Sequence, residues 1–259
     1  DLAVRLADIE QTRAAYMAMA FIALGLFLKM ALFPLHFWLV PAYSYAPSAV
    51  SALMAATATK VSVYVLVRLM FGVFGIGFVG ISDGLGTVLL TLGIIGAFVG
   101  TLAAIVETDL KKLFAQSSIA QLGYMAIGIG IMTPAGLAAA FIHLFNHALM
   151  KGTLFLAIGV IGAKTGRATM RTIEGAGRQI PMTMTAILFG GLALIGVPLT
   201  AGFISKLYLF KALFETNNGI LVAIIAFSSV LSVLYLWKIF EVMWLKEPTK
   251  PLKIEKEPI

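Results

Sequence analysis

Residues 25–41 read GLFLKMALFPLHFWLVP, which places a lysine and a proline inside a segment that is otherwise apolar except for His36. The apolar run extends from about residue 16 to residue 40, and roughly 20 such residues suffice to cross a bilayer. Lys29 lies near the middle of this run, where a charged side chain is unfavourable. Pro34 lacks the amide hydrogen that a continuous helix requires. The stretch therefore predicts a membrane helix that is broken close to a buried charge.

The composition of the whole chain supports this interpretation. The 259 residues are 60% hydrophobic and only 12% charged, and the mean hydropathy is +0.99. Soluble domains average about 25% charged residues, so the chain is expected to be an integral membrane protein. There is no cysteine, which excludes thiolate metal sites, iron–sulfur ligation and disulfides. The net charge of +7 does not indicate nucleic-acid binding, because the cations concentrate in loops and in the C-terminal tail.

Apolar segments long enough to span the membrane recur along the chain. The sixth segment is too long for one straight helix, and GVPLTAG at residues 196–202 interrupts it with a proline and two glycines. Two half-helices are expected there, and unwound backbone at membrane depth is typical of ion paths. We predict an all-α polytopic membrane protein with about seven transmembrane helices, two of them broken. The segments are 16–40, 48–78, 86–106, 114–132, 136–162, 181–214 and 219–244.

The distribution of basic residues predicts the topology, because lysine and arginine mark the cytoplasmic side of short loops. The other side carries only Arg5, Arg13 and Lys211. We therefore expect the N-terminus outside the cell and the C-terminus in the cytoplasm. The residues collected on the predicted cytoplasmic side are Lys111, Lys112, Lys164, Arg167, Arg171, Arg178, Lys246, Lys250, Lys253 and Lys256.

Lys29, Lys60, Lys151 and Lys206 lie within the apolar segments. Lysines near a helix end can extend their ammonium group to the membrane interface. We expect this of Lys211 and Lys238, with an interior position as the alternative for both. A central lysine facing lipid costs about 3 kcal/mol, so we expect the four deeper lysines to face the protein interior. A lysine in apolar surroundings can gain and lose a proton as a neighbouring charge changes, as a proton relay requires.

The fifth segment carries His143, His147 and Lys151 at positions i, i+4 and i+8, which places three titratable groups on one helical face. Two histidines at this spacing can bind a metal, but no acidic or cysteine ligand accompanies them. A chain of proton carriers fits the pattern better. We predict no metal and no cofactor.

Ser117, Gln121 and Tyr124 form a polar stripe at i, i+4 and i+7 in the fourth segment. Such residues either bridge helices by hydrogen bonds or hold water between charged sites, and the sequence leaves both open. In the loop before this segment, Glu107 and Asp109 are expected to pair with Lys111 or Lys112 in a structural role. His36 is interpreted as an interface residue or a proton entrance near the cytoplasmic end of its segment.

Several stretches together resemble the antiporter-like subunits shared by complex I, membrane-bound hydrogenases and Mrp-type sodium/proton antiporters. They are FPLHFWLVPAYSYAPSAVSALMAATATKVSVY after Lys29, ETDLKKLFAQSSIAQLGY, HLFNHALMKGTLFLAIG and LIGVPLTAGFISK. They occur in the family's order and spacing from about residue 1 to residue 244. Within the family, AGRQIP and GGLALIGVPLTAGFISKLYL are most similar to the D subunit of Mrp antiporters, with only the C-terminal portion represented.

The resemblance implies two five-helix repeats of inverted topology, each with one broken helix. Residues 1–78 would then be the end of the first repeat, residues 79–244 the complete second repeat, and residues 245–259 a polar cytoplasmic tail. In the family, a glutamate on an earlier helix pairs with the residue matching Lys29, but no Asp or Glu occurs between Glu10 and Asp83. We therefore expect the sequence to begin partway through a longer polypeptide.

The resemblance also implies the function. It suggests a proton-translocating subunit of a multi-subunit Na⁺/H⁺ antiporter in the bacterial plasma membrane, with other membrane subunits as partners. The alternative is a proton-pumping subunit of a complex I-type NADH:quinone oxidoreductase or a membrane-bound hydrogenase, with any redox chemistry in its partners. The expected proton relay consists of Lys29, Lys60, His143, His147, Lys151 and Lys206.

Overall fold

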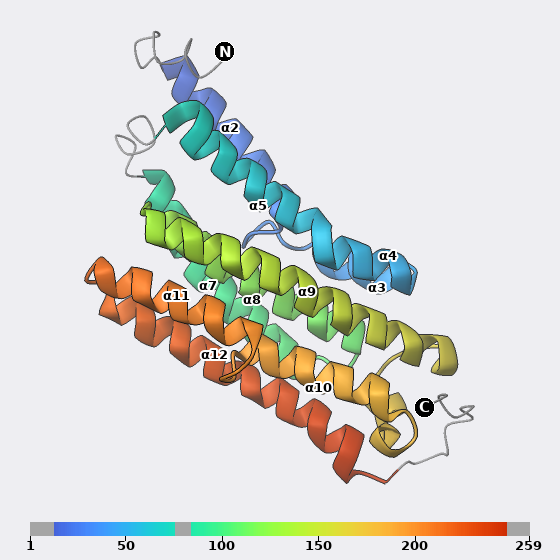
Figure 1. Ribbon diagram of the computed structural model, residues 1–259. Coiled ribbons are helices and arrows are strands. Elements are labelled where there is room, and N and C mark those ends of the chain that lie inside the picture. Colours follow the sequence, from blue (N-terminus) through green and yellow to red (C-terminus); the bar gives the residue numbers. More distant parts are fainter. Residues whose placement is uncertain (1–12, 76–83, 248–259) are drawn as a thin grey trace.

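The computed structural model describes residues 13–75 and 84–247, and this part of the chain is helical without β-strands (Figure 1). Within these described residues, five helices are long and apolar enough to cross a membrane, and the shorter apolar helix Pro181–Ile195 accompanies them. The elements are α2 (Arg13–Met30), α3 (Leu39–Tyr45), α4 (Ser48–Leu53), η1 (Met54–Ala58), α5 (Thr59–Val67), η2 (Arg68–Phe74), α7 (Gly84–Val106), α8 (Leu110–Gly130), α9 (Pro134–Thr165), η3 (Met170–Ile173), η4 (Ala176–Arg178), α10 (Pro181–Ile195), α11 (Ala201–Glu215), α12 (Gly219–Phe240) and η5 (Glu241–Leu245).

Both predicted breaks are confirmed. In the first, α2 ends at Met30 and Ala31 has a φ of 59°, so the backbone leaves the helix before α3 begins. In the second, Gly196 ends α10 with a φ of 87°, a conformation that glycine adopts without steric cost. Thr200 then begins α11, because its hydroxyl oxygen accepts a hydrogen bond from the amide of Phe203.

Helix α9 lies between two groups of helices (Figure 1). The segments α2 to α5 lie on one side of it, and the broken pair α10 and α11 lies on the other, with α12 beyond them. Every residue of α8 from position 117 to position 130 is buried, so this helix forms the centre of the bundle. A polar group on α8 or on the facing side of α9 is therefore surrounded by protein.

The packing of α7 against α8 depends on small residues. A Cβ atom added to Gly123 would lie 2.4 Å from the carbonyl oxygen of Gly93, and one added to Gly93 would lie 2.7 Å from that of Gly123. The two backbones are in direct contact, as is common between membrane helices. This contact fixes the position of α8 and of the polar side chains on it.

The ends of the bundle differ in charge as predicted. A cluster of cationic side chains lies at the end where α8 begins and α9 finishes, whereas Arg13 and Lys211 belong to the helical halves that lead to the opposite end. The basic residues at the first end are Lys111, Lys112, Lys164, Arg167, Arg171, Arg178 and Lys246. The predicted Arg5, Lys250, Lys253 and Lys256 lie outside the described residues.

Candidate functional site

The three titratable residues of α9 share one buried face, as their spacing predicts. His143 is 3% exposed, and His147 and Lys151 are fully buried. The rings of His143 and His147 are parallel, with an interplanar angle of 2° and centroids 6.1 Å apart. The helix thus holds a row of two imidazoles and one ammonium inside the protein.

Lys151 is held by α8. Its Nζ donates hydrogen bonds of 2.6 Å to the carbonyl oxygen of Phe114 and of 2.6 Å to Oγ of Ser117. The ammonium also lies 5.4 Å from the centroid of the Phe114 ring. Both acceptors are neutral, and no carboxylate of the described residues pairs with Lys151.

Lys60 approaches the same row from α5. Its Nζ donates to the carbonyl oxygen of Ala55, which lies in the π-helical turn η1 directly before α5. A π-turn within a membrane helix displaces carbonyl groups from regular pairing and often occurs at functional sites. Lys60 is buried, and the turn η1 that accepts its hydrogen bond packs against α9. Nothing in the sequence indicated this π-turn.

Lys206 occupies the second break. Its Nζ donates to the carbonyl oxygens of Leu194 at 2.9 Å and Ile195 at 2.7 Å, which end α10 and have no later helical amide to pair with. The ammonium lies 5.0 Å from the centroid of the Tyr124 ring. Lys206 is 4% exposed and borders a cavity of about 230 Å³. It therefore stabilises the broken helix and carries a titratable group at the same place.

His143 connects α8, α9 and α11. Its Nδ1 lies 2.8 Å from Oγ of Ser205, and its Nε2 lies 3.0 Å from Oε1 of Gln121. The Tyr124 ring meets the imidazole edge-on, with centroids 6.0 Å apart. Gln121 and Tyr124 belong to the polar stripe seen in the sequence, and both do form hydrogen bonds between helices.

His147 differs from its neighbour. Within the described residues, neither of its ring nitrogens has a hydrogen-bond partner, although the residue is fully buried. Buried imidazole nitrogens are normally paired. His147 thus lies between His143 and Lys151 on α9 with both ring nitrogens unpaired within the described residues.

Lys29 differs from the other three deep lysines. Lys60, Lys151 and Lys206 are buried as expected, whereas Lys29 on α2 is exposed in the described part of the chain, so its interior position stays a prediction. His36 was expected near a helix end but lies in the break between α2 and α3, buried and stacked against Phe33 and Phe37. The described chain presents no protein surface that covers Lys29.

Sequence reasoning missed the polar side of α12. The hydroxyl of Tyr124 donates to Oγ of Ser228 at 3.0 Å, and Oγ of Ser228 donates in turn to the carbonyl oxygen of Ala97 at 3.2 Å. Ser232 and Tyr235 on the same helix are also buried. Ser228, Ser232 and Tyr235 follow the spacing i, i+4 and i+7 in an otherwise apolar helix, and this spacing could have identified them.

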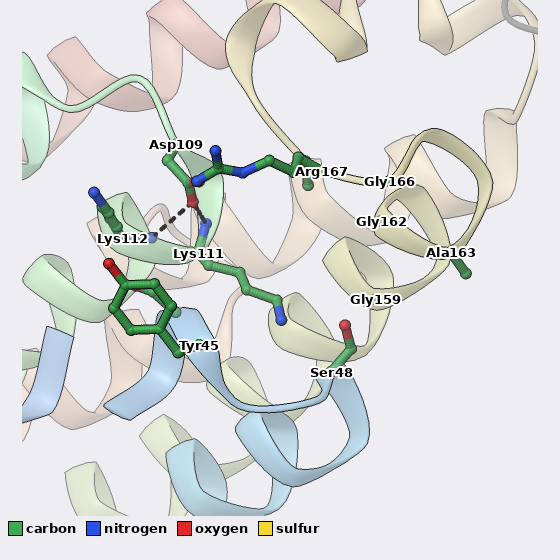
Figure 2. Close-up of a pocket in the computed structure, with 12 residues that line it drawn as sticks. Tyr45, Ser48, Asp109, Lys111, Lys112, Gly159, Gly162, Ala163, Gly166 and Arg167 are labelled. Carbon is green, nitrogen blue, oxygen red and sulfur yellow. Dashed lines mark hydrogen bonds and ion pairs between the residues drawn. The ribbon is translucent and has the colours of Figure 1, made fainter. Parts of the chain in front are cut away.

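The basic end of the bundle contains a pocket of about 570 Å³ (Figure 2). Asp109 caps α8 there by accepting hydrogen bonds from the backbone amides of Lys111 and Lys112, and its carboxylate lies 3.5 Å from the Arg167 guanidinium. The predicted pairing of Asp109 with the side chain of Lys111 or Lys112 is therefore wrong. Lys111 instead donates to the carbonyl oxygen of Ala46 at 3.0 Å. These contacts connect the start of α8 to the residue after α3 and to the loop after α9.

Histidine and acidic residues do not gather into a metal-binding group of three or more in residues 13–75 and 84–247. The arrangement consists instead of lysines and histidines, buried among neutral partners and located at helix breaks. It defines a polytopic membrane protein whose interior holds a row of titratable groups.

Comparison with known proteins identifies the family. Residues 4–232 match the family described as "NADH:quinone oxidoreductase/Mrp antiporter, TM", and the chain belongs to this family. It is 37% identical to NADH-quinone oxidoreductase subunit N of Desulforudis audaxviator, over 100% of this chain and 51% of that protein. It is 31% identical to the D subunit of the Na(+)/H(+) antiporter of Alkalihalophilus pseudofirmus, over 93% of this chain and 48% of that protein.

A solved structure shares the fold. The structure of the Mrp complex from Dietzia sp. DQ12-45-1b contains a chain with a TM-score of 0.84 and 28% identity, covering 92% of this chain and 44% of that one. The chain thus spans about half the length of the curated relatives it matches.

Proposed function

We propose that this chain moves protons across the plasma membrane as the antiporter-like part of a multi-subunit complex. The observation that supports the proposal is the buried series Lys60, Lys151, His147, His143 and Lys206, drawn from α5, α9 and α11. Intramembrane titratable groups are costly and mark proton pathways. In a scaffold without a transport role, such groups would add cost with no benefit.

The mechanism that fits this series is electrostatic. The acceptors of the three buried lysines are backbone carbonyls and the hydroxyl of Ser117, so no fixed negative charge neutralises them. Charges of the same sign repel strongly in an apolar interior. His143 lies between Lys60 and Lys206 in the series, so a positive charge on either lysine opposes one on the imidazole. A proton added at one group therefore displaces a proton from the next.

Lys29 belongs to the same proposal but to a different half of the pathway. Its exposed position on α2 fits a role in which a carboxylate outside this chain supplies its partner. The assignment of residues 1–78 to the end of a first repeat and of 79–244 to a second is part of this proposal. So is the orientation with the C-terminal tail in the cytoplasm.

Two kinds of complex are candidates for the driving reaction. The 37% identity to an NADH-quinone oxidoreductase subunit over the whole chain supports a redox-driven proton pump. The 31% identity to a sodium/proton antiporter subunit and the TM-score of 0.84 to an Mrp complex support sodium-coupled exchange, which the sequence resemblance favoured. In both, neighbouring membrane subunits are the partners, and the lysine–histidine series has the same role.

The test uses the complete protein within its native complex in everted membrane vesicles. Lys151→Met is expected to abolish proton uptake while the complex still assembles. Lys211→Met on the exposed face of α11 is the matched control and is expected to transport normally. Normal uptake by both Lys151→Met and Lys206→Met would refute the proposal. Uptake that requires a reductant and a quinone identifies the redox-driven complex, whereas uptake driven by a sodium gradient alone identifies the antiporter.

A further inference from the structure

Gln121 and Ser205 each form a hydrogen bond with one ring nitrogen of His143. The direction of each bond determines which ring nitrogen carries a hydrogen. Oγ of Ser205 lies 3.0 Å from the carbonyl oxygen of Gly202 and donates its hydrogen there. Toward Nδ1 of His143, at 2.8 Å, the same hydroxyl can then act only as an acceptor. Nδ1 is therefore the nitrogen that carries a hydrogen.

The other nitrogen faces an acceptor as well. Nε2 of His143 lies 3.0 Å from the amide oxygen of Gln121, so a hydrogen on Nε2 completes that bond. An imidazole with a hydrogen on both nitrogens is the imidazolium cation. The arrangement with the Gln121 oxygen toward His143 therefore suits the charged form. It also leaves the buried amide nitrogen of Gln121 without a partner.

Turning the Gln121 amide by 180° exchanges its oxygen and nitrogen in nearly the same space. The amide nitrogen then donates to Nε2, which must be the unprotonated nitrogen of a neutral imidazole. The bond from Nδ1–H to Ser205 and the bond from Ser205 to Gly202 are the same in both arrangements. The two states differ by one proton on Nε2 and by the orientation of one amide.

We propose that Gln121 is a positioning residue whose amide orientation switches His143 between the imidazolium and the neutral Nδ1–H form, with Ser205 fixing the other nitrogen in both. This inference rests on the proposed proton relay and adds to it the atom at which His143 gains and loses its proton, Nε2. The turn of the amide couples each proton transfer to a local movement.

The charged and titratable groups around His143 come from all the helices packed there. They are Tyr124 on α8, His147 on the same helix as His143, Lys206 on α11 and Lys60 on α5. Because burial away from water disfavours a charged side chain that lacks partners, an acceptor oxygen at Nε2 favours the cation. Gln121 supplies that oxygen.

The test is ¹⁵N nuclear magnetic resonance of the complete, histidine-labelled protein in lipid bilayers, with His143 assigned by the signals lost in His143→Asn. The wild type is expected to titrate between the imidazolium and the neutral Nδ1–H form. Gln121→Leu is expected to keep His143 in the neutral Nδ1–H form and to suppress the imidazolium, because Nε2 loses its acceptor while Ser205 still accepts from Nδ1. Gln121→Glu is expected to retain the imidazolium to higher pH, because a carboxylate only accepts. Gln116→Glu, the same change 5 positions earlier on α8, is expected to leave the His143 signals unchanged.

Ser205→Ala provides a second variant if Gln121→Leu does not fold, and it should shift the neutral form to Nε2–H by removing the acceptor at Nδ1. A wild-type protein with neutral His143 in the Nε2–H form would overturn the inference, as would an unchanged spectrum in Gln121→Leu or Ser205→Ala. These signals do not depend on transport. If the spectra were as expected but Gln121→Leu still took up protons normally, the switch at His143 would stand. The role of His143 in the proton relay would then be refuted.

Discussion

The ammonium of Lys151 on α9 and the hydroxyl of Ser117 on α8 form a 2.6 Å hydrogen bond in the centre of the bundle. The same hydroxyl lies 3.1 Å from the carbonyl oxygen of Phe114, which also accepts from Lys151. Lysine, serine and carbonyl thus form a closed group with no water-exposed member. A buried ammonium is tolerated only when such partners replace its hydration.

Ser117→Ala tests how much this group contributes. Loss of a buried hydrogen bond to a charged group costs about 1.5–3 kcal/mol, so the variant should unfold at a lower temperature and should transport protons more slowly. Ser118→Ala is the matched control, because Ser118 is equally buried and bonds to Phe114 but does not contact Lys151. The measurements are thermal unfolding in lipid nanodiscs and proton uptake by vesicles. Equal effects of the two variants would contradict a specific role for Ser117.

Substitutions at Lys206 separate structure from proton transfer. Lys206→Arg keeps a cation and its donors next to Leu194 and Ile195 but introduces a group that does not lose its proton in proteins. We expect this variant to retain most of its stability and to lose proton uptake by about 100-fold or more, the scale of general acid–base effects.

Lys206→Met removes the donors as well, so the two carbonyls at the end of α10 lose their partners. We expect it to lose uptake and in addition about 1–3 kcal/mol of stability. Proton uptake near the wild-type rate in Lys206→Arg would show that this lysine only stabilises the break. Unfolding and uptake are measured on the same vesicle preparations.

The helices and their breaks could be predicted because they depend on local chemistry. Pro34 in the first segment and the glycine-flanked Pro198 in the sixth interrupt the helix wherever the chain folds, so their effect is visible in the sequence. The shared face of His143, His147 and Lys151 follows from helical periodicity alone. These features need no knowledge of neighbouring helices.

The remaining contacts depend on which helices meet. The bond of His143 to Ser205 joins residues 62 positions apart, and that of Tyr124 to Ser228 joins residues 104 apart. No local pattern specifies such pairs. The exposure of Lys29 could not be predicted either, because burial of a side chain on α2 depends on what packs against that helix. The preference of Asp109 for Arg167 over the lysines next to it in sequence has the same origin.

Gly123→Ala tests the contact between α7 and α8. The added methyl group would lie 2.4 Å from the carbonyl oxygen of Gly93, so the helices must separate, and overpacking of this kind costs about 1–3 kcal/mol. Gly162→Ala on α9 is the control, since its Cβ would meet nothing within 4 Å. The control should be neutral or more stable by up to about 1 kcal/mol, because alanine favours helix over glycine. Thermal unfolding in nanodiscs compares them, and equal stability of the two variants would exclude direct backbone contact.

Two substitutions at Asp109 distinguish its helix cap from its ion pair with Arg167. The Arg167 side chain is 75% exposed, and an exposed ion pair contributes about 0–1 kcal/mol, whereas loss of a helix cap costs about 1 kcal/mol. Asparagine caps helices as well as aspartate does but carries no charge. We therefore expect Asp109→Asn to be close to the wild type and Asp109→Ala to be less stable by about 1 kcal/mol. Thermal unfolding measures both variants at low and high salt. Equal loss of stability in the two variants, removed by raising the salt concentration, would show that the ion pair rather than the cap stabilises this end of α8.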